Sequence, residues 1–163
     1  MAWSTLTARS AGDAILASDQ NITAANFAEL APFFSTFTNY TPTLTQSGAV
    51  TKTSGYCRYL QIGKLVIAQV NLSCTGAGTG GNVVLVGLPI AATASLAVGS
   101  RCGTGHIFDA STSTRYVGVA EIRSSTTVGL VTDVTGVDAW GAAPSIALAN
   151  TDQINFAVMY EAA

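Results

Sequence analysis

The stretch from Gly55 to Leu72 consists of two runs of alternating side chains on either side of a Gly-Lys pair. Successive side chains of a β-strand point to opposite faces, so this period of two predicts two strands, Tyr56–Ile62 and Lys64–Ser73. Gly63 can adopt a positive φ at little steric cost, as a two-residue hairpin loop requires. The stretch therefore predicts a β-hairpin. One face of its second strand is expected to be buried: Val66, Ala68, Val70 and Leu72.

The rest of the chain from Tyr40 onward is made of short apolar runs separated by Gly, Ser, Thr and Asn. Nine such runs with frequent turns predict a mainly β fold, a jelly-roll-like antiparallel β-sandwich. The number of strands alone does not separate a jelly roll from other Greek-key sandwiches. The predicted strands are Thr41–Thr45, Tyr56–Ile62, Lys64–Ser73, Asn82–Leu88, Leu96–Arg101, Gly105–Phe108, Arg115–Ile122, Thr127–Thr132 and Gln153–Tyr160. The predicted core residues are Val66, Val70, Leu72, Ile154, Phe156 and Val158.

The N-terminal part of the chain differs from the rest in composition. Asp13 to Leu30 is rich in Ala, and Thr23 is a suitable N-cap for a helix from Ala24 to about Ala31, which Pro32 ends. We therefore expect a short, partly helical N-terminal segment, residues 1–38, followed by a β-sandwich domain, residues 39–163. Phe33, Phe34 and Phe37 are too many aromatic residues for a solvated linker, so the segment is expected to pack either on a partner or on its own β-domain.

Charged residues make up only 10% of the chain, against about 25% in a typical soluble domain. A surface with so few charges suggests that part of it is covered in a homo-oligomer. The net charge is −2 and the basic residues are scattered, so we expect binding neither to nucleic acid nor to an anionic membrane. The first residues lack a basic segment followed by an apolar run, so synthesis and assembly in a cytoplasm are expected.

The hairpin contains Arg58-Tyr59 and Gln61-Ile62-Gly63-Lys64, with Tyr40-Thr41-Pro42-Thr43-Leu44-Thr45 upstream and Leu88-Pro89 downstream. Together with Val66, these motifs resemble the β-sandwich domains found at the tips of bacteriophage fibres and on phage virion surfaces. The resemblance covers about residues 38–163. A second run also resembles an N-terminal segment of phage fibre and tail-appendage proteins: Gly12, Asp13, Ile15, Leu16, Ala17, Ser18, Asp19 and Asn21.

The resemblance implies a non-enzymatic phage structural protein on the virion surface, a capsid decoration or head-fibre protein that assembles in the host cytoplasm. Residues 1–38 would attach to the major capsid protein, the β-sandwich would project outward, and the assembly would be a homotrimer. The alternative is a tail-fibre tip that is attached to a tail protein and recognises a host-surface saccharide. The residues expected to make the attachment are Trp3, Leu6, Ile15, Leu16, Ile22, Phe27, Leu30 and Phe34.

The sequence does not favour an enzyme, a cofactor or a metal site. A serine hydrolase would need a histidine base, but the one histidine, His106, lacks a GxSxG motif and is expected to be a strand residue. The acidic residues lie singly, whereas a glycosidase needs two positioned carboxylates. Cys57, Cys74 and Cys102 are odd in number and form no CxxC pair, so they are expected to be reduced thiols.

The run from Asp133 to Pro144 contains the best candidates for a ligand site. Asp133 and Asp138 supply too few oxygens for a calcium loop, so an ordinary polar turn is the favoured interpretation. Trp140, close to Asp138 in the sequence and inside Gly136 to Pro144, is a candidate for stacking on a saccharide. The alternative is that Trp140 caps one end of the sandwich.

Arg58 is a further candidate, because Tyr56 and Tyr59 lie beside it in the sequence. This arrangement is compatible with a group that holds a ligand. An arginine on a strand face can instead pair across the sheet or between subunits, and this second interpretation is favoured.

Overall fold

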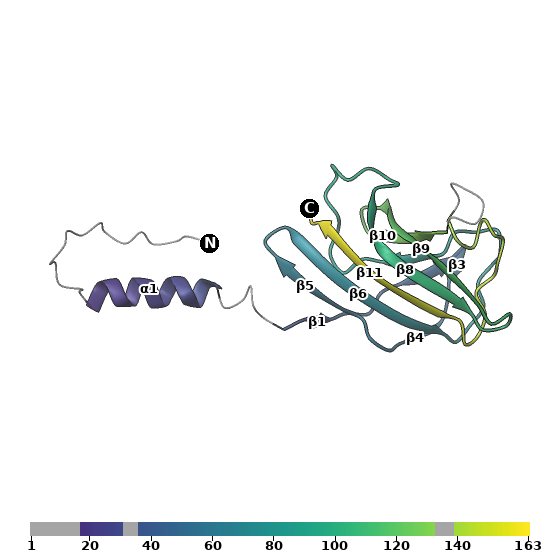
Figure 1. Cartoon of the computed structure of the whole chain (residues 1–163), viewed down its shortest axis with the longest axis horizontal. Coiled ribbons are helices and arrows are strands. Elements are labelled where there is room, and N and C mark those ends of the chain that lie inside the picture. Colours follow the sequence, from purple (N-terminus) through teal and green to yellow (C-terminus); the bar gives the residue numbers. More distant parts are fainter. Residues whose placement is uncertain (1–16, 31–35, 133–138) are drawn as a thin grey trace. The chain divides into compact units, whose positions relative to one another are not determined.

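A computed structural model describes residues 17–30, 36–132 and 139–163 of the chain. The chain divides into two compact units, Met1–Thr36 and Phe37–Ala163. The described part is mainly β, as predicted, with one short helix in the first unit and all the strands in the second (Figure 1).

The helix α1 spans Ala17–Leu30 and is longer than the sequence predicted. It begins seven positions before the expected start at Ala24, so Thr23 lies inside the helix and is not its N-cap. The Ala, Gln and Glu residues have high helix propensity and support the additional turns. The helix ends at Leu30. Pro32 follows in the sequence, and a proline disfavours helical backbone angles in the residue before it.

The described residues of the β unit form an eleven-stranded antiparallel sheet in the order β1-β5-β6-β11-β8-β9-β10-β7-β2-β3, with β4 also paired to β6. The sheet curls so that side chains from β5 through to β2 along this order contribute to one core. The predicted division into the two sheets of a jelly roll is not confirmed. The strands are β1 Thr38–Asn39, β2 Leu44–Gln46, β3 Gly48–Ala49, β4 Lys52–Ser54, β5 Arg58–Ile62, β6 Leu65–Cys74, β7 Leu85–Gly87, β8 Arg101–Asp109, β9 Thr114–Ser124, β10 Thr127–Val131 and β11 Gln153–Glu161.

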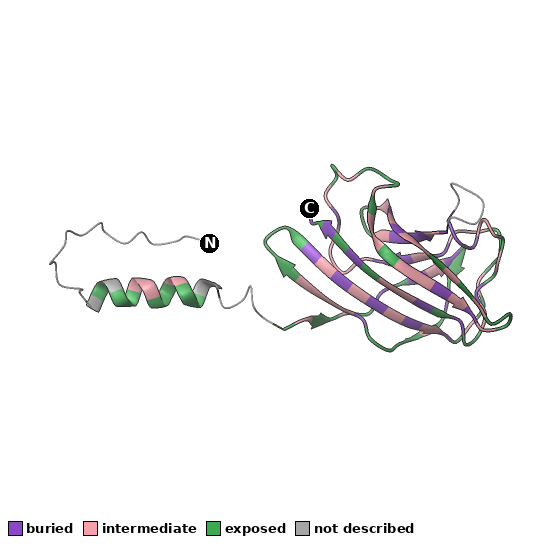
Figure 2. Cartoon of the chain, viewed as in Figure 1, coloured by how far each residue is buried: buried purple, intermediate pink, exposed green. Residues whose placement is uncertain are grey.

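The predicted hairpin is confirmed in both its arms and its turn. β5 and β6 pair from Arg58 opposite Gln69 to Ile62 opposite Leu65, and Gly63 has a φ of 59°. Buried and half-buried positions alternate along β6, as Figure 2 shows. The four side chains expected to face the core are all buried: Val66, Ala68, Val70 and Leu72.

β11 lies in the middle of the sheet, between β6 and β8 (Figure 1). Ile154 and Val158 are buried beside the inner residues of β6, as predicted. Phe156 is only half-buried but packs against the same core. The predicted core of the hairpin and the last strand is therefore confirmed in position.

The predicted strand Leu96–Arg101 is wrong, apart from its last residue. The amide of Leu96 donates to the carbonyl of Thr93, and the amide of Ser100 donates to that of Ala97. Gly99 adopts a φ of 91°, which favours a turn over an extended strand. Residues 93–96 and 97–100 thus form two successive turns before β8 begins.

The side chain of Gln46 ties together two distant loops. It is only 1% exposed. Its Nε2 donates to the carbonyls of Asn82, at 3.1 Å, and Ile146, at 2.7 Å, and its Oε1 accepts from the amide of Leu148, at 2.8 Å. A buried amide with three such bonds satisfies backbone groups that would otherwise lack partners. Gln46 therefore fixes the loops around residues 82 and 146–148 against β2.

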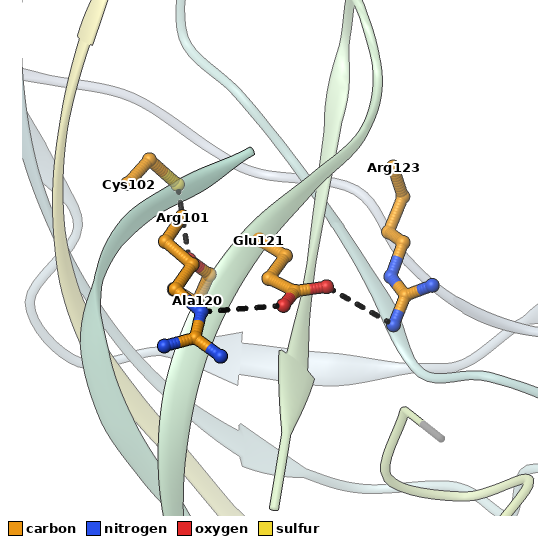
Figure 3. Close-up of polar contacts among 5 residues, drawn as sticks. All are labelled: Arg101, Cys102, Ala120, Glu121 and Arg123. Atoms are coloured by element: carbon orange, nitrogen blue, oxygen red, sulfur yellow. Dashed lines mark hydrogen bonds and ion pairs between the residues drawn. The ribbon is translucent and has the colours of Figure 1, made fainter. Parts of the chain in front are cut away.

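The three cysteines are free thiols, in agreement with the sequence prediction. Cys102 Sγ donates to the carbonyl of Ala120 at 3.4 Å (Figure 3). Burial raises the pKa of the Cys74 and Cys102 thiols to about 11. Both are therefore protonated at neutral pH and act as small apolar side chains.

Buried Tyr160 leads to a prediction at high pH. Its hydroxyl donates to the carbonyl of Ile90 at 2.7 Å, and burial raises its pKa from 10.0 to about 12. A raised pKa in the folded state means that this stabilising contribution is complete below pH 10 and is lost as the pH rises through about 12. We expect the free energy of unfolding in urea to fall over this range, and to fall less steeply in Tyr160→Phe. The same pH dependence in both proteins would contradict this assignment.

Candidate functional site

Strands β5, β6, β11, β8 and β9 lie next to one another in the sheet and form one broad surface. Alternate side chains on these strands face the core, and the others point to the opposite side, which we call the outer face. Cross-strand partners on this face follow from the pairing register. The outer face has three neighbouring parts, described in turn below.

The first part, the arginine cluster, is formed by Arg58, Phe37, Tyr56 and Gln69. The guanidinium carbon of Arg58 lies 4.3 Å from the centre of the Phe37 ring and 4.1 Å from that of Tyr56. Its Nε donates to Gln69 Oε1 at 3.0 Å. Two rings and one hydrogen bond therefore hold the guanidinium in a fixed orientation.

The second part, the polar row, is formed by Asn71, Asn155 and His106 on β6, β11 and β8. These residues face one another across the strands. Asn71 Nδ2 donates to Asn155 Oδ1, and Asn155 Nδ2 lies 3.4 Å from His106 Nε2. Partial burial, and secondarily the charge of Arg115, lowers the pKa of His106. The polar row is therefore uncharged at neutral pH.

The third part, the apolar patch, lies on β5, β6 and β11 on the other side of Arg58. Leu60, Ile67 and Met159 face one another across the strands, and Ile62 faces Leu65 in the next row. Met159 is 58% exposed, and Ile62 and Leu65 are also exposed. Large apolar side chains gathered on one surface are typical of an interaction site.

The described charges on the outer face are mostly positive. Arg115 lies with its guanidinium 5.8 Å from the Phe108 ring, beyond the polar row. One acidic residue of β11, Glu161, lies opposite Leu65 at the edge of the apolar patch. An acidic ligand or partner group is therefore favoured near Arg58.

Two acidic residues near this face are buried and serve the backbone. Asp152 accepts hydrogen bonds from the amides of Ala110, at 2.9 Å, and Ala149, at 2.8 Å. Asp109 Oδ1 accepts from the hydroxyl and amide of Ser111. The Ser111 hydroxyl is the main cause of a lowered Asp109 pKa. Both carboxylates therefore fix turns at the ends of strands.

A separate charged group lies at the start of β8 and the end of β9 (Figure 3). The Glu121 carboxylate lies 3.9 Å from Arg101 Nε and 3.7 Å from Arg123 Nη2. Arg101 is largely solvated, with 78% of its side chain exposed. The Arg101 pair is therefore close to water and contributes little stability. Arg123 and Glu121 are less exposed, with 23% and 14% of their side chains accessible, and the carboxylate compensates the nearby positive charge.

The predicted ligand residue Trp140 lies in the core. Its side chain is 0% exposed, and its ring packs edge-on against Tyr116, with centroids 5.7 Å apart. A ring without an exposed face cannot stack on a saccharide, so the structure corrects that interpretation and favours a packing role. Asp138, its predicted companion, and Asp133 lie outside the described residues.

Of the eight predicted attachment residues, the structure describes the side chains of two. Ile22 is half-buried, whereas Phe27 is 66% exposed on α1. Leu30 is the last residue of the helix. The remaining five lie outside the described residues: Trp3, Leu6, Ile15, Leu16 and Phe34.

Sequence reasoning considered Arg58 and Tyr56 as a ligand-holding group, although it favoured a pairing role for Arg58, and it missed Phe37, Gln69 and the polar row. The alternation of the hairpin already placed Gln69 and Asn71 on the side away from the core, so their position on the outer face could have been predicted. The contribution of Asn155 and His106 depends on the order β6-β11-β8, which short-range patterns do not contain.

Neither a metal site nor a membrane span is found among the described residues. Within residues 17–30, 36–132 and 139–163, no three His, Cys, Asp or Glu side chains gather closely enough to hold a metal ion. No helix in that part of the chain is long and apolar enough to cross a membrane. Comparisons with protein-family models, curated proteins and solved structures found no match.

Proposed function

We propose that this chain is a non-enzymatic structural protein of a bacteriophage virion, a capsid decoration or head-fibre protein located on the virion surface. The resemblance of the hairpin and its flanking motifs to phage surface domains supports this setting. The observation that carries the proposal is the division of the chain between Thr36 and Phe37. It separates a short helical unit, suited to attachment, from a β unit built around its own core.

The exposed Phe27 supports attachment through the N-terminal segment. An aromatic side chain in water loses about 2 kcal/mol relative to one that is fully covered. The major capsid protein is the proposed partner, and it would cover this ring together with the other apolar residues of the segment. The β unit then projects outward, and assembly takes place in the host cytoplasm.

The apolar patch supports self-association as a homotrimer. Ile62, Leu65 and Met159 are exposed in adjacent strands. Covering them with a neighbouring copy removes apolar surface from water, which contributes about 25 cal/mol for each Å². A threefold assembly also fits threefold or quasi-threefold positions of a shell without a symmetry mismatch.

A protein that begins at Phe37 tests the attachment. It is expected to remain folded, to have the mass of a trimer in light scattering, and to lose binding to shells assembled without this protein. In the full chain, Phe27→Ser is expected to weaken that binding about tenfold or more, since burial of a Phe side chain is lost.

Ala25→Ser is the matched control, because Ala25 is also an exposed residue of α1. It should bind shells as the unaltered chain does. Binding by the protein that begins at Phe37 would overturn attachment through the N-terminal segment, and a monomeric mass would overturn the trimer.

The second candidate function is that of a tail-fibre tip that binds a host-surface saccharide. The arginine cluster and the polar row favour it, because they combine aromatic rings with amide donors and acceptors on an open strand surface. A reconstruction of the whole virion distinguishes the two functions by location. Density for this chain at the tail tip alone would replace the decoration function with receptor binding.

A further inference from the structure

We propose that the arginine cluster and the polar row form a binding site for a saccharide that carries a carboxylate. Arg58 binds the carboxylate, and the amides of Gln69, Asn71 and Asn155 bind hydroxyl groups of the sugar. The inference deepens the second candidate function by naming the ligand class, and it applies to the same outer face wherever the protein lies on the virion.

The orientation of Arg58 is the first argument. The Phe37 and Tyr56 rings contact the guanidinium group, and Gln69 Oε1 accepts its Nε–H. Within the described part of the chain, no hydrogen bond or ion pair involves its two terminal NH2 groups. These groups form a planar pair of donors whose spacing matches the two oxygens of a carboxylate.

The distribution of charge is the second argument. The buried carboxylates Asp109 and Asp152 accept hydrogen bonds from backbone amides of Ser111 and Ala110, and among the described residues no ion pair joins either of them to Arg58. Glu161 lies opposite Leu65 of β6, whereas Arg58 lies opposite Gln69. Ile67 lies between these two positions on the same face, so Glu161 and Arg58 are not neighbours. Arg58 thus keeps its positive charge uncompensated beside an uncharged polar row, which favours an anion at that point.

The neighbouring groups identify a saccharide in preference to a simple anion. Amide side chains both donate and accept hydrogen bonds, as sugar hydroxyls do. Asn71 and Asn155 use one hydrogen bond with each other, and Asn155 Nδ2 also lies 3.4 Å from His106 Nε2. Each amide still has further donors and acceptors. The exposed Tyr56 ring adds an apolar surface suited to the C–H face of a sugar.

A purely structural role for Arg58 makes a different prediction. In that case the stacked guanidinium would only hold the start of β5 against Phe37, and its replacement would lower stability without affecting any ligand.

Gly55 lies close to the polar row, because a Cβ added there would come within 2.5 Å of Asn71 Oδ1. Gly55→Ala is therefore expected to displace the Asn71 side chain, and it tests the contribution of the polar row without replacing Arg58.

The test is an NMR titration of the full-length protein with glucuronate, galacturonate and N-acetylneuraminate at millimolar concentrations. The methyl ester of each acid and plain acetate serve as probes without the charge and without the sugar, respectively. We expect at least one acid to shift the Arg58 Nε–H signal. Its methyl ester should bind at least about tenfold more weakly, because it lacks the charged carboxylate. Arg58→Gln and Arg58→Lys should both lose this binding, because neither presents the planar pair of donors.

Arg101→Gln is the matched control, since it removes the same charge from an exposed arginine outside the site. It should leave binding unchanged, and Gly55→Ala should weaken it. Thermal unfolding of each variant verifies that the protein is folded.

Four results would overturn the proposal: no shift with any of the acids, equal binding of acid and ester, equal binding of acetate, or equal loss in Arg101→Gln. A fifth is that Glu161→Gln and Arg58→Gln both dissociate the oligomer, which would assign Arg58 to an ion pair between copies. Binding of the protein to host cells without any response to these acids would overturn the ligand class while leaving the receptor function intact.

Discussion

Val70→Asp is expected to leave the β unit unfolded at room temperature. Val70 is 3% exposed and lies opposite Phe156 in the centre of the sheet. A carboxylate there has no described cationic partner, and burying it costs several kcal/mol in addition to the lost apolar contacts. This cost is comparable with the total stability of a typical domain, about 5–15 kcal/mol. Circular dichroism and urea unfolding measure the effect.

Ala157→Asp is the matched control for this prediction, because Ala157 is an exposed residue of the adjacent strand β11. Its free energy of unfolding should change by no more than about 0.5 kcal/mol. If Val70→Asp retained the thermal stability of the unaltered protein, the inner and outer faces of β6 would have been assigned the wrong way round.

Gln46→Leu is expected to lower the free energy of unfolding by at least about 3 kcal/mol. The leucine side chain has a similar size but leaves the carbonyls of Asn82 and Ile146 and the amide of Leu148 without their partner. Each buried backbone group without a hydrogen bond costs about 1–3 kcal/mol. Urea unfolding followed by tryptophan fluorescence measures the loss.

Two further variants show whether the hydrogen bonds of Gln46 are responsible. Gln46→Glu keeps an acceptor for Leu148 but removes both donated bonds, so it should also be strongly destabilised. Thr45→Ala changes the preceding, half-buried residue of β2 and should have a small effect. A loss below about 1 kcal/mol in Gln46→Leu would mean that other contacts hold these loops.

The hairpin shows what the sequence is able to determine. The faces of β6 and the turn at Gly63 follow from alternation and from the freedom of glycine, both of which act within a few residues. The position of β11 between β6 and β8 depends instead on pairing between segments far apart in the chain. The alternation of Ile154 and Val158 predicted their burial without indicating which strands lie beside them.

Trp140 and Gln46 show why the rest was not predicted. A tryptophan among glycines and polar residues has the composition of an exposed turn, yet Trp140 lies against Tyr116 on β9. Gln46 lies in a polar context as well, and its role depends on backbone groups 36 to 102 residues away. For the same reason, the sequence suggested Arg58 only as an alternative ligand group, and it did not indicate the residues on the neighbouring strands.

The central position of β11 has a consequence for how the protein is made. The ribosome synthesises this strand after all the other described strands, although it fills the gap between β6 and β8. Until residues 153–161 have left the ribosome, both neighbours keep an unpaired edge, and the sheet cannot become continuous. Unpaired edges are templates for pairing with other chains, and closure between distant segments is slow. Folding of the β unit is therefore completed after translation of β11, and the interval before it is when a nascent chain is most prone to aggregate.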